Sequence, residues 1–480
     1  MTKKNFTKKT AQIILCLITA VILNSCSIII PPSQAEISID EYATKHPLSI
    51  VSLDVQKYDM YVDFSDGIVF AYDDTATSKH MLNLVNKVLQ STNLDKTYAM
   101  GQNTITDISG LSSTQFYNKV IDKKNYVDIM APIEQTLKSI TEGDNLAILV
   151  TDYEEYTQDK RVQHQAYAAD YFNAWLEKGG NIVFYAFAYK EKNLDKHLYI
   201  TLFDNSANSL DKEVQESFEG LEHNYTRFNL SNTAYSITTD YPAETKGGCN
   251  HDPQKMDDII SYTNEDGNAD SWHIIAGQAA EYYPFEEKWS NIYEGAKATI
   301  EDYKDTPKQQ RQDLIDYKCL IGNLTIDFSE LHSYNIEELE AIVYNIQADV
   351  DAYSQYVNDS INYDPDDTDE DGKSLPLPKY KPEKYTKVPD MLVFNGSLED
   401  KKANVSIDFS PKFTGSLPSA LQDGQTIAVD IVVSKCQPDY AQINNLFFWG
   451  NNNSLEQSVR LTMQKFKPEG KVLYRYYIKN

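Results

Sequence analysis

Short apolar runs alternate with amphipathic stretches along the chain from Val51 to residue 235. The continuous apolar run Leu146–Thr151 is typical of a strand buried on both faces, whereas Tyr167–Lys178 spaces its apolar residues at the helical period and ends at Gly179-Gly180. Apolar strands that alternate with helices of about a dozen residues indicate a mostly parallel sheet covered on both sides. Residues 51–235 are therefore predicted to form an α/β domain.

The same patterns place the other elements of this domain. Further strands are expected at Met60–Phe64, Thr97–Gly101, Thr104–Ile108, Ile182–Phe187 and Leu198–Phe203. Further helices are expected at Lys79–Gln90, Asp128–Ile140 and Asp211–Leu221.

The pattern changes after residue 235. Residues 236–320 are predicted to be an irregular or helical connector, with a helix at Glu286–Asp305. Residues 321–480 are predicted to form a β-rich, sandwich-like domain, interrupted by a helix at Ile336–Val357 and an acidic, proline-rich insertion at Asp364–Pro389. The strands expected in it are Asn323–Phe328, Met391–Phe394, Asn404–Phe409, Thr426–Ser434, Ser458–Met463 and Val472–Ile478.

The N-terminus has the three parts of an export signal. Four lysines precede the apolar run Ala11–Leu23, whose length of about 13 residues suits a signal peptide and is too short for a membrane anchor. The sequence Leu23-Asn24-Ser25-Cys26 resembles a lipobox, which implies cleavage before Cys26 and lipidation of that cysteine. The alternative is an ordinary secretory signal followed by a chance cysteine. We predict a lipoprotein signal peptide at 1–25 and a lipid-anchored tether at 26–50.

The residues after Cys26 bear on where a lipoprotein is delivered. Ser27 is not acidic, which is compatible with delivery to the outer membrane. The run Ser27–Ile30 lacks the acidic tag associated with surface lipoproteins of Bacteroidetes. The chain is thus expected in the cell envelope, at the outer membrane, and the sequence leaves open whether it faces the periplasm or the cell surface.

Charge narrows the set of partners. The formal net charge is −27, and removal of the four signal-peptide lysines leaves the mature chain near −31. Such a chain repels nucleic acid and anionic lipid, so the membrane is expected to be reached through the lipid alone. A hydrophobic content of 41% excludes a disordered acidic polymer.

Three cysteines remain after the signal and the lipidation site. An extracytoplasmic compartment permits a disulfide, and Cys249 with Cys319 is the pair nearest in sequence. Three thiols cannot all pair within one chain, so the pairing with Cys436 stays open.

Two strand ends carry a motif of oxygen-bearing residues. The first strand ends in Asp63-Phe64-Ser65-Asp66-Gly67, and Leu146–Thr151 is followed by Asp152. Between them Tyr126-Val127-Asp128-Ile129 precedes a predicted helix. In order and spacing these motifs resemble those of a von Willebrand factor A-like domain, over about 185 residues. The resemblance implies a divalent cation, Mg²⁺ or Ca²⁺, held by oxygens at one edge of the sheet and completed by a carboxylate of a protein partner.

The implied metal site is degenerate. Asp63, Ser65 and Asp152 match the ligand pattern, but Gly67 and Val127 stand where hydroxyl-bearing residues are expected. Three of five ligands remain, so we expect no tight Mg²⁺ binding. We assign no cofactor, and Mg²⁺ or Ca²⁺ is the ion that the resemblance allows. The alternative role of Asp63 and Ser65 is to cap the turn after the strand.

Other motifs are weaker. Asp367–Gly372 begins like a calcium loop, but Pro378 occupies the position of its essential glutamate. Glu154-Glu155 offers an acid and a base for a hydrolase at the carboxyl edge of the sheet. Six aromatic residues near the C-terminus could form a glycan platform, and they are Phe447, Phe448, Trp449, Tyr474, Tyr476 and Tyr477.

These observations favour a non-enzymatic, envelope-anchored lipoprotein that binds or assembles with a protein partner through the α/β domain. A hydrolase that uses the acidic residues at the sheet edge is the first alternative. A carbohydrate-binding lipoprotein that uses the C-terminal aromatic residues is the second. A hydrolase requires titratable groups that converge in an accessible pocket, and a glycan platform requires exposed rings.

Overall fold

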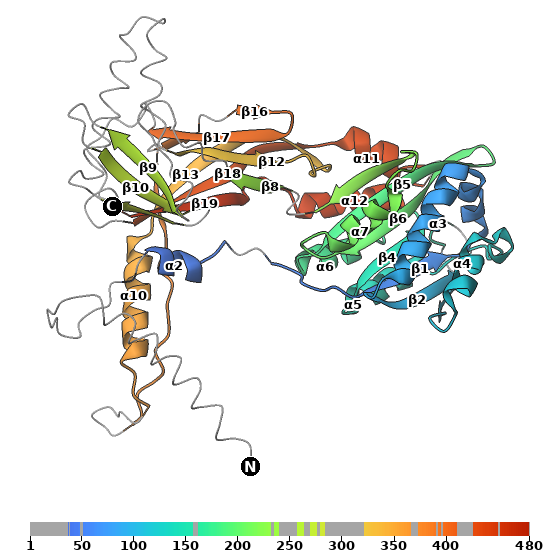
Figure 1. Cartoon of the computed structure of the whole chain (residues 1–480), viewed down its shortest axis with the longest axis horizontal. Coiled ribbons are helices and arrows are strands. Elements are labelled where there is room, and N and C mark those ends of the chain that lie inside the picture. Colours follow the sequence, from blue (N-terminus) through green and yellow to red (C-terminus); the bar gives the residue numbers. More distant parts are fainter. Residues whose placement is uncertain are drawn as a thin grey trace, which may run out of the picture. The chain divides into compact units, whose positions relative to one another are not determined.

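The computed structural model describes residues 37, 39–48, 51–156, 162–231, 235–239, 321–365, 373–389, 392–394, 397–409, 426–449 and 452–479, and the backbone of three strands between 257 and 283 (Figure 1). Cys26, Cys249, Cys319, the expected helix Glu286–Asp305 and the calcium-like motif Asp367–Gly372 lie outside the described residues. The chain divides into two compact units, and residues 348–384 belong to a different unit from 39–347 and 385–480.

The α/β class predicted for residues 51–235 is confirmed by a seven-stranded central sheet in the order β3-β2-β1-β4-β6-β5-β7. Its strands are β1 (Tyr58–Asp63), β2 (Leu94–Gly101), β3 (Thr104–Asp107), β4 (Leu146–Thr151), β5 (Asn181–Glu191), β6 (Leu194–Asp204) and β7 (Tyr225–Leu230).

Parallel strands form the centre of this sheet. β1 pairs in parallel with β2 on one side and with β4 on the other. β6 is antiparallel to both β4 and β5, so β5 runs in the same direction as β1, β2 and β4. The β5–β6 hairpin turns at Lys192, whose φ of 58° lies in the left-handed region. Because β6 is antiparallel to β4, this turn projects beyond the carboxyl end of β4.

Helices cover both faces of the sheet. Adjacent residues of a strand point to opposite faces, and in β5 Phe184 packs against Phe172 and Phe447 while Tyr185 packs against Phe218. One helical layer comprises α3 (Thr75–Gln90), α4 (Ser113–Ile121) and α7 (Ser209–Phe218). The other comprises α5 (Ile133–Glu142), α6 (Ala169–Glu177), α11 (Tyr440–Phe447) and α12 (Ser454–Lys465).

Two helices of that second layer come from the C-terminal part of the chain. The backbone N–H of Ala168 donates to the Ser458 hydroxyl at 3.2 Å, and Phe447 stacks on Tyr199 at 5.9 Å between ring centroids. The expected strand Ser458–Met463 is wrong, because this segment lies in α12. Leu455, Val459 and Met463 recur every four residues and are buried, which is helical spacing.

The expected helix Asp128–Ile140 begins later than predicted. α5 starts at Ile133, and Asp128 instead forms a parallel bridge with Ser65. Pro132 explains the boundary, since the residue before a proline is disfavoured in the helical conformation. Residues 126–130 are therefore a non-helical segment, joined to the end of β1 by the bridge at Asp128.

The β-rich part contains two further sheets, mostly antiparallel. One has the order β14-β13-β18-β19-β11-β10-β9, and the other β15-β17-β12-β8 with β16 paired to β17. Their strands are β8 (Ser236–Thr239), β9 (Asp257–Thr263), β10 (Ala269–Ile275), β11 (Ala279–Tyr283), β12 (Ile321–Asp327), β13 (Tyr334–Asn345), β14 (Thr386–Val388), β15 (Leu392–Phe394), β16 (Ser397–Glu399), β17 (Lys402–Phe409), β18 (Thr426–Pro438) and β19 (Val472–Lys479).

Two predictions for this part are corrected. The described stretches of the expected connector 236–320 are strands, which join sheets with strands from beyond residue 320. The expected helix Ile336–Val357 is strand β13 followed by α10 (Gln347–Ile361). Pairing with β18, whose first eight residues are buried, overrides the helix propensity of the Glu-Glu-Leu-Glu-Ala sequence in β13.

The expected tether 26–50 contains a packed helix. α2 (Ile39–Lys45) places Tyr42 in contact with Tyr477 of β19, at 5.8 Å between ring centroids. The Tyr477 hydroxyl donates to the carbonyl oxygen of His46 at 2.9 Å. Tyr42 is fully buried, so a tether that starts at Cys26 must end before this helix and cannot extend to residue 50.

The unit that contains α10 is held by a buried carboxylate. Asp349 accepts hydrogen bonds from the Tyr380 hydroxyl at 2.7 Å and from the backbone N–H of Glu383 at 2.6 Å. Tyr353 packs edge-on against Tyr380 at 5.3 Å. The described end of the acidic insertion therefore folds back on α10.

Candidate functional site

The carboxyl ends of β1 and β4 bring the predicted site residues together. Asp63 is the last residue of β1, and Asp152 directly follows β4. The two strands pair in parallel, with Val62 opposite Val150, so both carboxylates leave the sheet at the same edge. Asp63 and Asp152 are 1% and 3% exposed.

The Asp63 carboxylate is fixed by its neighbours. One oxygen accepts the backbone N–H of Ser65 at 2.7 Å, which closes the turn after β1, and the other accepts the Thr151 hydroxyl at 2.7 Å. Burial, and next the charge of Asp152, raise the pKa of Asp63 to about 7. The capping role considered for Asp63 is thus one of its functions in this structure.

A lysine lies beside Asp152. The Lys196 Nζ is 2.5 Å from a Glu154 oxygen, 2.7 Å from a Glu191 oxygen and 3.4 Å from Asp152 Oδ2, and Lys196 is 2% exposed. Burial lowers the pKa of Lys196, but the charges of Asp152 and Glu154 outweigh burial and raise it above its ordinary value. The ammonium group is therefore the counterion of three carboxylates.

This lysine lies in the β5–β6 hairpin, whose register sets its position. Lys196 in β6 is directly opposite Tyr189 in β5, and the Tyr189 hydroxyl donates to Asp152 Oδ2 at 3.4 Å. Glu191, two residues after Tyr189, is on the same face of β5. A Cβ atom at Gly67 would lie 3.5 Å from Asp152 Oδ2 and 3.7 Å from Lys196 Nζ, so Gly67 borders the same cluster.

The turn after β4 carries an unusual backbone conformation. Tyr153 has a φ of 58°, in the left-handed region that non-glycine residues rarely adopt, and its ring is fully buried. Its hydroxyl donates to Thr201 at 3.0 Å. The turn is closed by the Glu154 N–H, which donates to Asp152 Oδ1 at 3.0 Å. Local strain of this kind persists only where packing over-determines it, and here it sets the direction of Asp152 and Glu154.

The remaining positions of the expected metal site lie apart from this cluster. Val127 is 68% exposed. The Asp128 carboxylate lies over Gly101, where an added Cβ would be 2.1 Å from Asp128 Oδ2. Among the residues that the structure describes, no group of three or more His, Cys, Asp or Glu side chains is arranged to hold a metal ion.

The residues of the two alternative functions have other roles. Glu155 accepts the backbone N–H of Glu134 at 2.6 Å and so caps α5, and burial raises the pKa of Glu155. Of the six C-terminal aromatic residues, Phe447, Trp449, Tyr474 and Tyr477 are buried, and Phe448 is 47% exposed. These four rings form no exposed glycan platform.

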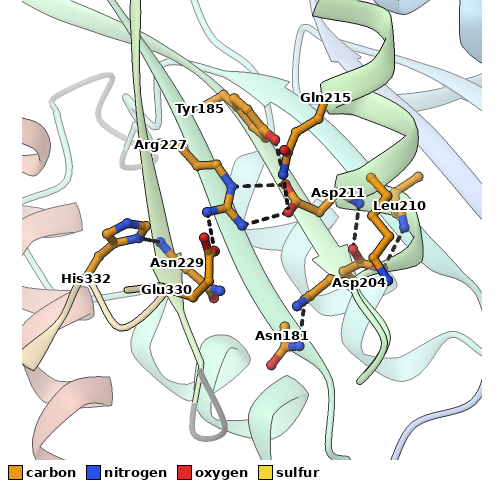
Figure 2. Close-up of polar contacts among 12 residues, drawn as sticks. Asn181, Tyr185, Asp204, Leu210, Asp211, Gln215, Arg227, Asn229, Glu330 and His332 are labelled. Carbon is orange, nitrogen blue, oxygen red and sulfur yellow. Dashed lines mark hydrogen bonds and ion pairs between the residues drawn. The ribbon is translucent and has the colours of Figure 1, made fainter. Parts of the chain in front are cut away.

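A second polar cluster joins the far edge of the sheet to the β12–β13 loop (Figure 2). The Asp211 carboxylate, in α7, accepts hydrogen bonds from the Tyr185 hydroxyl at 2.6 Å and from Arg227 at 2.7 Å. Arg227, in β7, also pairs with Glu330. His332 Nδ1 accepts the backbone N–H of Asn229 at 2.9 Å, and burial and the charge of Arg227 lower the pKa of His332 to about 4. With this lowered pKa, His332 is neutral at pH 7, and it contacts the edge strand β7 through Asn229.

We did not predict Lys196, Tyr189 or Glu191 as residues of this site. Their position depends on the register of the β5–β6 hairpin, and the turn at Lys192-Asn193 is only a weak turn signal. A hairpin assignment would have placed Lys196 opposite Tyr189, whereas its position near the end of β4 depends on the separate pairing of β6 with β4.

Within the described ranges, no helix is both long and apolar enough to cross a membrane. Comparison with known protein families, curated proteins and solved structures found no match.

Proposed function

We propose that this chain is a lipoprotein of the bacterial cell envelope that binds or assembles with a protein partner through a von Willebrand factor A-like domain without a bound metal ion. The supporting observation is the placement of Asp63 and Asp152 at one sheet edge, buried and engaged by neighbouring groups. A hydrolase needs an acid and a base that reach substrate and water. Groups that are almost fully buried and already hydrogen-bonded serve better as supports of a rigid surface.

The non-helical segment 126–130 is the part of this edge that suits a partner. Val127 and Ile129 are 68% and 60% exposed, and they alternate with Asp128, whose side chain lies over Gly101. The backbone is fixed by the Asp66 N–H, which donates to the Asp128 carbonyl oxygen at 2.7 Å. Two exposed apolar side chains on a backbone held in place are contacts that a protein partner can cover without paying to order that backbone.

Site-specific photo-crosslinking tests the binding surface. A photoreactive amino acid at position 127, in cells of the source bacterium, is expected to give an adduct of discrete mass that survives treatment with a chelator. The matched control is Thr92, an exposed residue in the turn before β2, at the amino ends of the parallel strands. A photoreactive amino acid there is expected to give no adduct. Absence of an adduct at 127, equal adducts at both positions, or loss of the adduct on chelation contradicts the proposal.

The anchor is tested separately. Cys26→Ala is expected to prevent lipidation and to release the protein from membranes, because the mature chain is acidic and repels anionic lipid. Fractionation after a high-salt wash measures this, with Cys436→Ala as the control. A Cys26→Ala protein that stays with the membrane shows that lipid is not the anchor.

A further inference from the structure

The surroundings of Lys196 are those of a bound cation. Three carboxylates, from Asp152, Glu154 and Glu191, place an oxygen within 3.4 Å of its Nζ. They come from two separate parts of the chain, the turn after β4 and the end of β5. Lys196 itself is 2% exposed, so the ammonium has exchanged most of its water for these oxygens.

Charge balance explains why a cation is needed there. The carboxylates repel one another in a buried site, and Asp63 adds a fourth carboxyl group close to Asp152. An isolated buried ammonium is also costly, by several kcal/mol in proteins. The carboxylates and the ammonium therefore each offset the free-energy cost of burying the other. Removing either charge alone is expected to destabilise the arrangement.

The ammonium lies beside two of the five positions from which metal ligands are expected, Gly67 and Asp152. Gly67 stands at an expected ligand position, and a Cβ there would be 3.7 Å from Lys196 Nζ and 3.6 Å from Glu191 Oε2. Asp152, a second expected ligand, contacts the same Nζ. A Cβ at Gly67 would be in ordinary van der Waals contact with these groups, so position 67 borders the space that the lysine occupies.

We propose that the Lys196 ammonium replaces a divalent metal ion at this edge. The edge then keeps one folded arrangement at any concentration of divalent cations in the surrounding solution. The proposal deepens the proposed function and concerns the same edge, but its test measures cation binding and stability. It therefore holds or fails independently of the crosslinking experiment. The cation that best fits the vacated site is Ca²⁺, because Ca²⁺ takes oxygens at 2.3–2.6 Å in flexible geometry, whereas Mg²⁺ demands a near-ideal octahedron.

The experiment compares the full mature chain with a Lys196→Ala variant, using thermal unfolding and calorimetry with CaCl₂ and MgCl₂. The wild type is expected to bind neither ion and to melt at the same temperature with Ca²⁺ or with a chelator. Lys196→Ala is expected to lower the melting temperature by on the order of 10 °C in chelator, since it leaves buried carboxylates without a counterion. Millimolar Ca²⁺ is expected to bind this variant and to restore at least half of the loss.

Two control variants separate charge from packing. Lys190→Ala removes an exposed lysine of the same hairpin, paired only with Asp195 among the described contacts, and is expected to leave the melting temperature unchanged. Lys196→Ala combined with Glu154→Gln and Glu191→Gln removes both signs of charge. It is expected to be more stable than the single variant and insensitive to Ca²⁺, and it serves as the folded comparison if Lys196→Ala does not fold.

Four results would overturn the proposal. They are tight Ca²⁺ or Mg²⁺ binding by the wild type, a Lys196→Ala variant as stable as Lys190→Ala, a folded Lys196→Ala variant that takes up no Ca²⁺, and a triple variant no more stable than Lys196→Ala alone. The third shows that the lysine is a plain ion-pair partner. The fourth shows that its loss acts through packing rather than charge.

Discussion

The hydroxyl of Thr151 donates a hydrogen bond of 2.7 Å to the Asp63 carboxylate and so joins the ends of two strands that are 88 positions apart in the sequence. Because both groups are buried, this bond has no competition from water. It also leaves Asp63 close to Asp152, and the charge of Asp152 adds to burial in raising the pKa of Asp63.

The raised pKa predicts a pH dependence of stability. Asp63 titrates near its ordinary value of 3.8 in the unfolded chain and near 7 in the folded one, so between these values the folded state holds the extra proton. Stability from this group is therefore present below about pH 4 and is lost as the pH rises towards 7. Asp63→Asn removes this titration. Between pH 5 and about pH 8 the wild type should lose more stability than Asp63→Asn in chemical denaturation, and equal losses would contradict the assignment.

Gly179 is predicted to be essential for the close approach of residue 51. Its φ is +86°, and a Cβ there would lie 2.2 Å from the carbonyl oxygen of Val51. Gly179→Ala is expected to lower the free energy of unfolding by about 2 kcal/mol or more, from backbone strain together with this clash. Gly220→Ala is the control, since Gly220 has a φ of +74° with nothing within 4 Å, and it should cost about 1 kcal/mol. Equal costs would show that the contact is unimportant.

Phe447 is predicted to belong to the core of the α/β domain. It is fully buried and packs against Phe184 at 5.1 Å and Phe228 at 5.0 Å between ring centroids. Phe447→Ala should lower the free energy of unfolding by about 3–5 kcal/mol. Phe448→Ala, next in the chain and 47% exposed, should cost less than about 1 kcal/mol. Urea unfolding followed by fluorescence measures both, and similar values would remove Phe447 from the core.

Arg227 is predicted to contribute more to the free energy of unfolding than its ion-pair partner Glu330. Arg227→Met leaves Asp211, which is 3% exposed, without its cation and should cost about 3–5 kcal/mol. The Glu330 side chain is 52% exposed, so Glu330→Gln should cost less than about 1 kcal/mol. Denaturation midpoints of the two variants decide this. A larger effect of Glu330→Gln would show that the loop contact, and not the buried pair, carries the stability.

The α/β domain could be predicted because its strands and helices have clear hydrophobic periods. Leu146–Thr151 was placed to the residue, and Gly179 ends the preceding helix as expected. Where local propensity and tertiary pairing disagree, the prediction was wrong. β13 contains helix-favouring residues and pairs as a strand, and α12 could equally be read as an alternating strand.

The candidate site could be predicted only in part. Asp63, Ser65 and Asp152 are adjacent to their strands, so a local motif places them at one edge. The position of Lys196 is set by the register of the β5–β6 hairpin. A shift of one residue in that register would turn its side chain to the other face of the sheet. Sequence spacing therefore indicated where oxygens gather, and did not indicate which cation they surround.

The contribution of α11 and α12 to the α/β domain makes that domain discontinuous in sequence. One face of its sheet, including Phe184 and Tyr199, is completed by residues near position 447. During synthesis, residues up to the end of α12 must therefore leave the ribosome before this core can close, and the long intervening segment adds loop-closure entropy to that step. Fragments that stop at residue 235 would lack α11 and α12 and would leave part of one face of the sheet uncovered, so residues 51–235 alone are not the unit that folds.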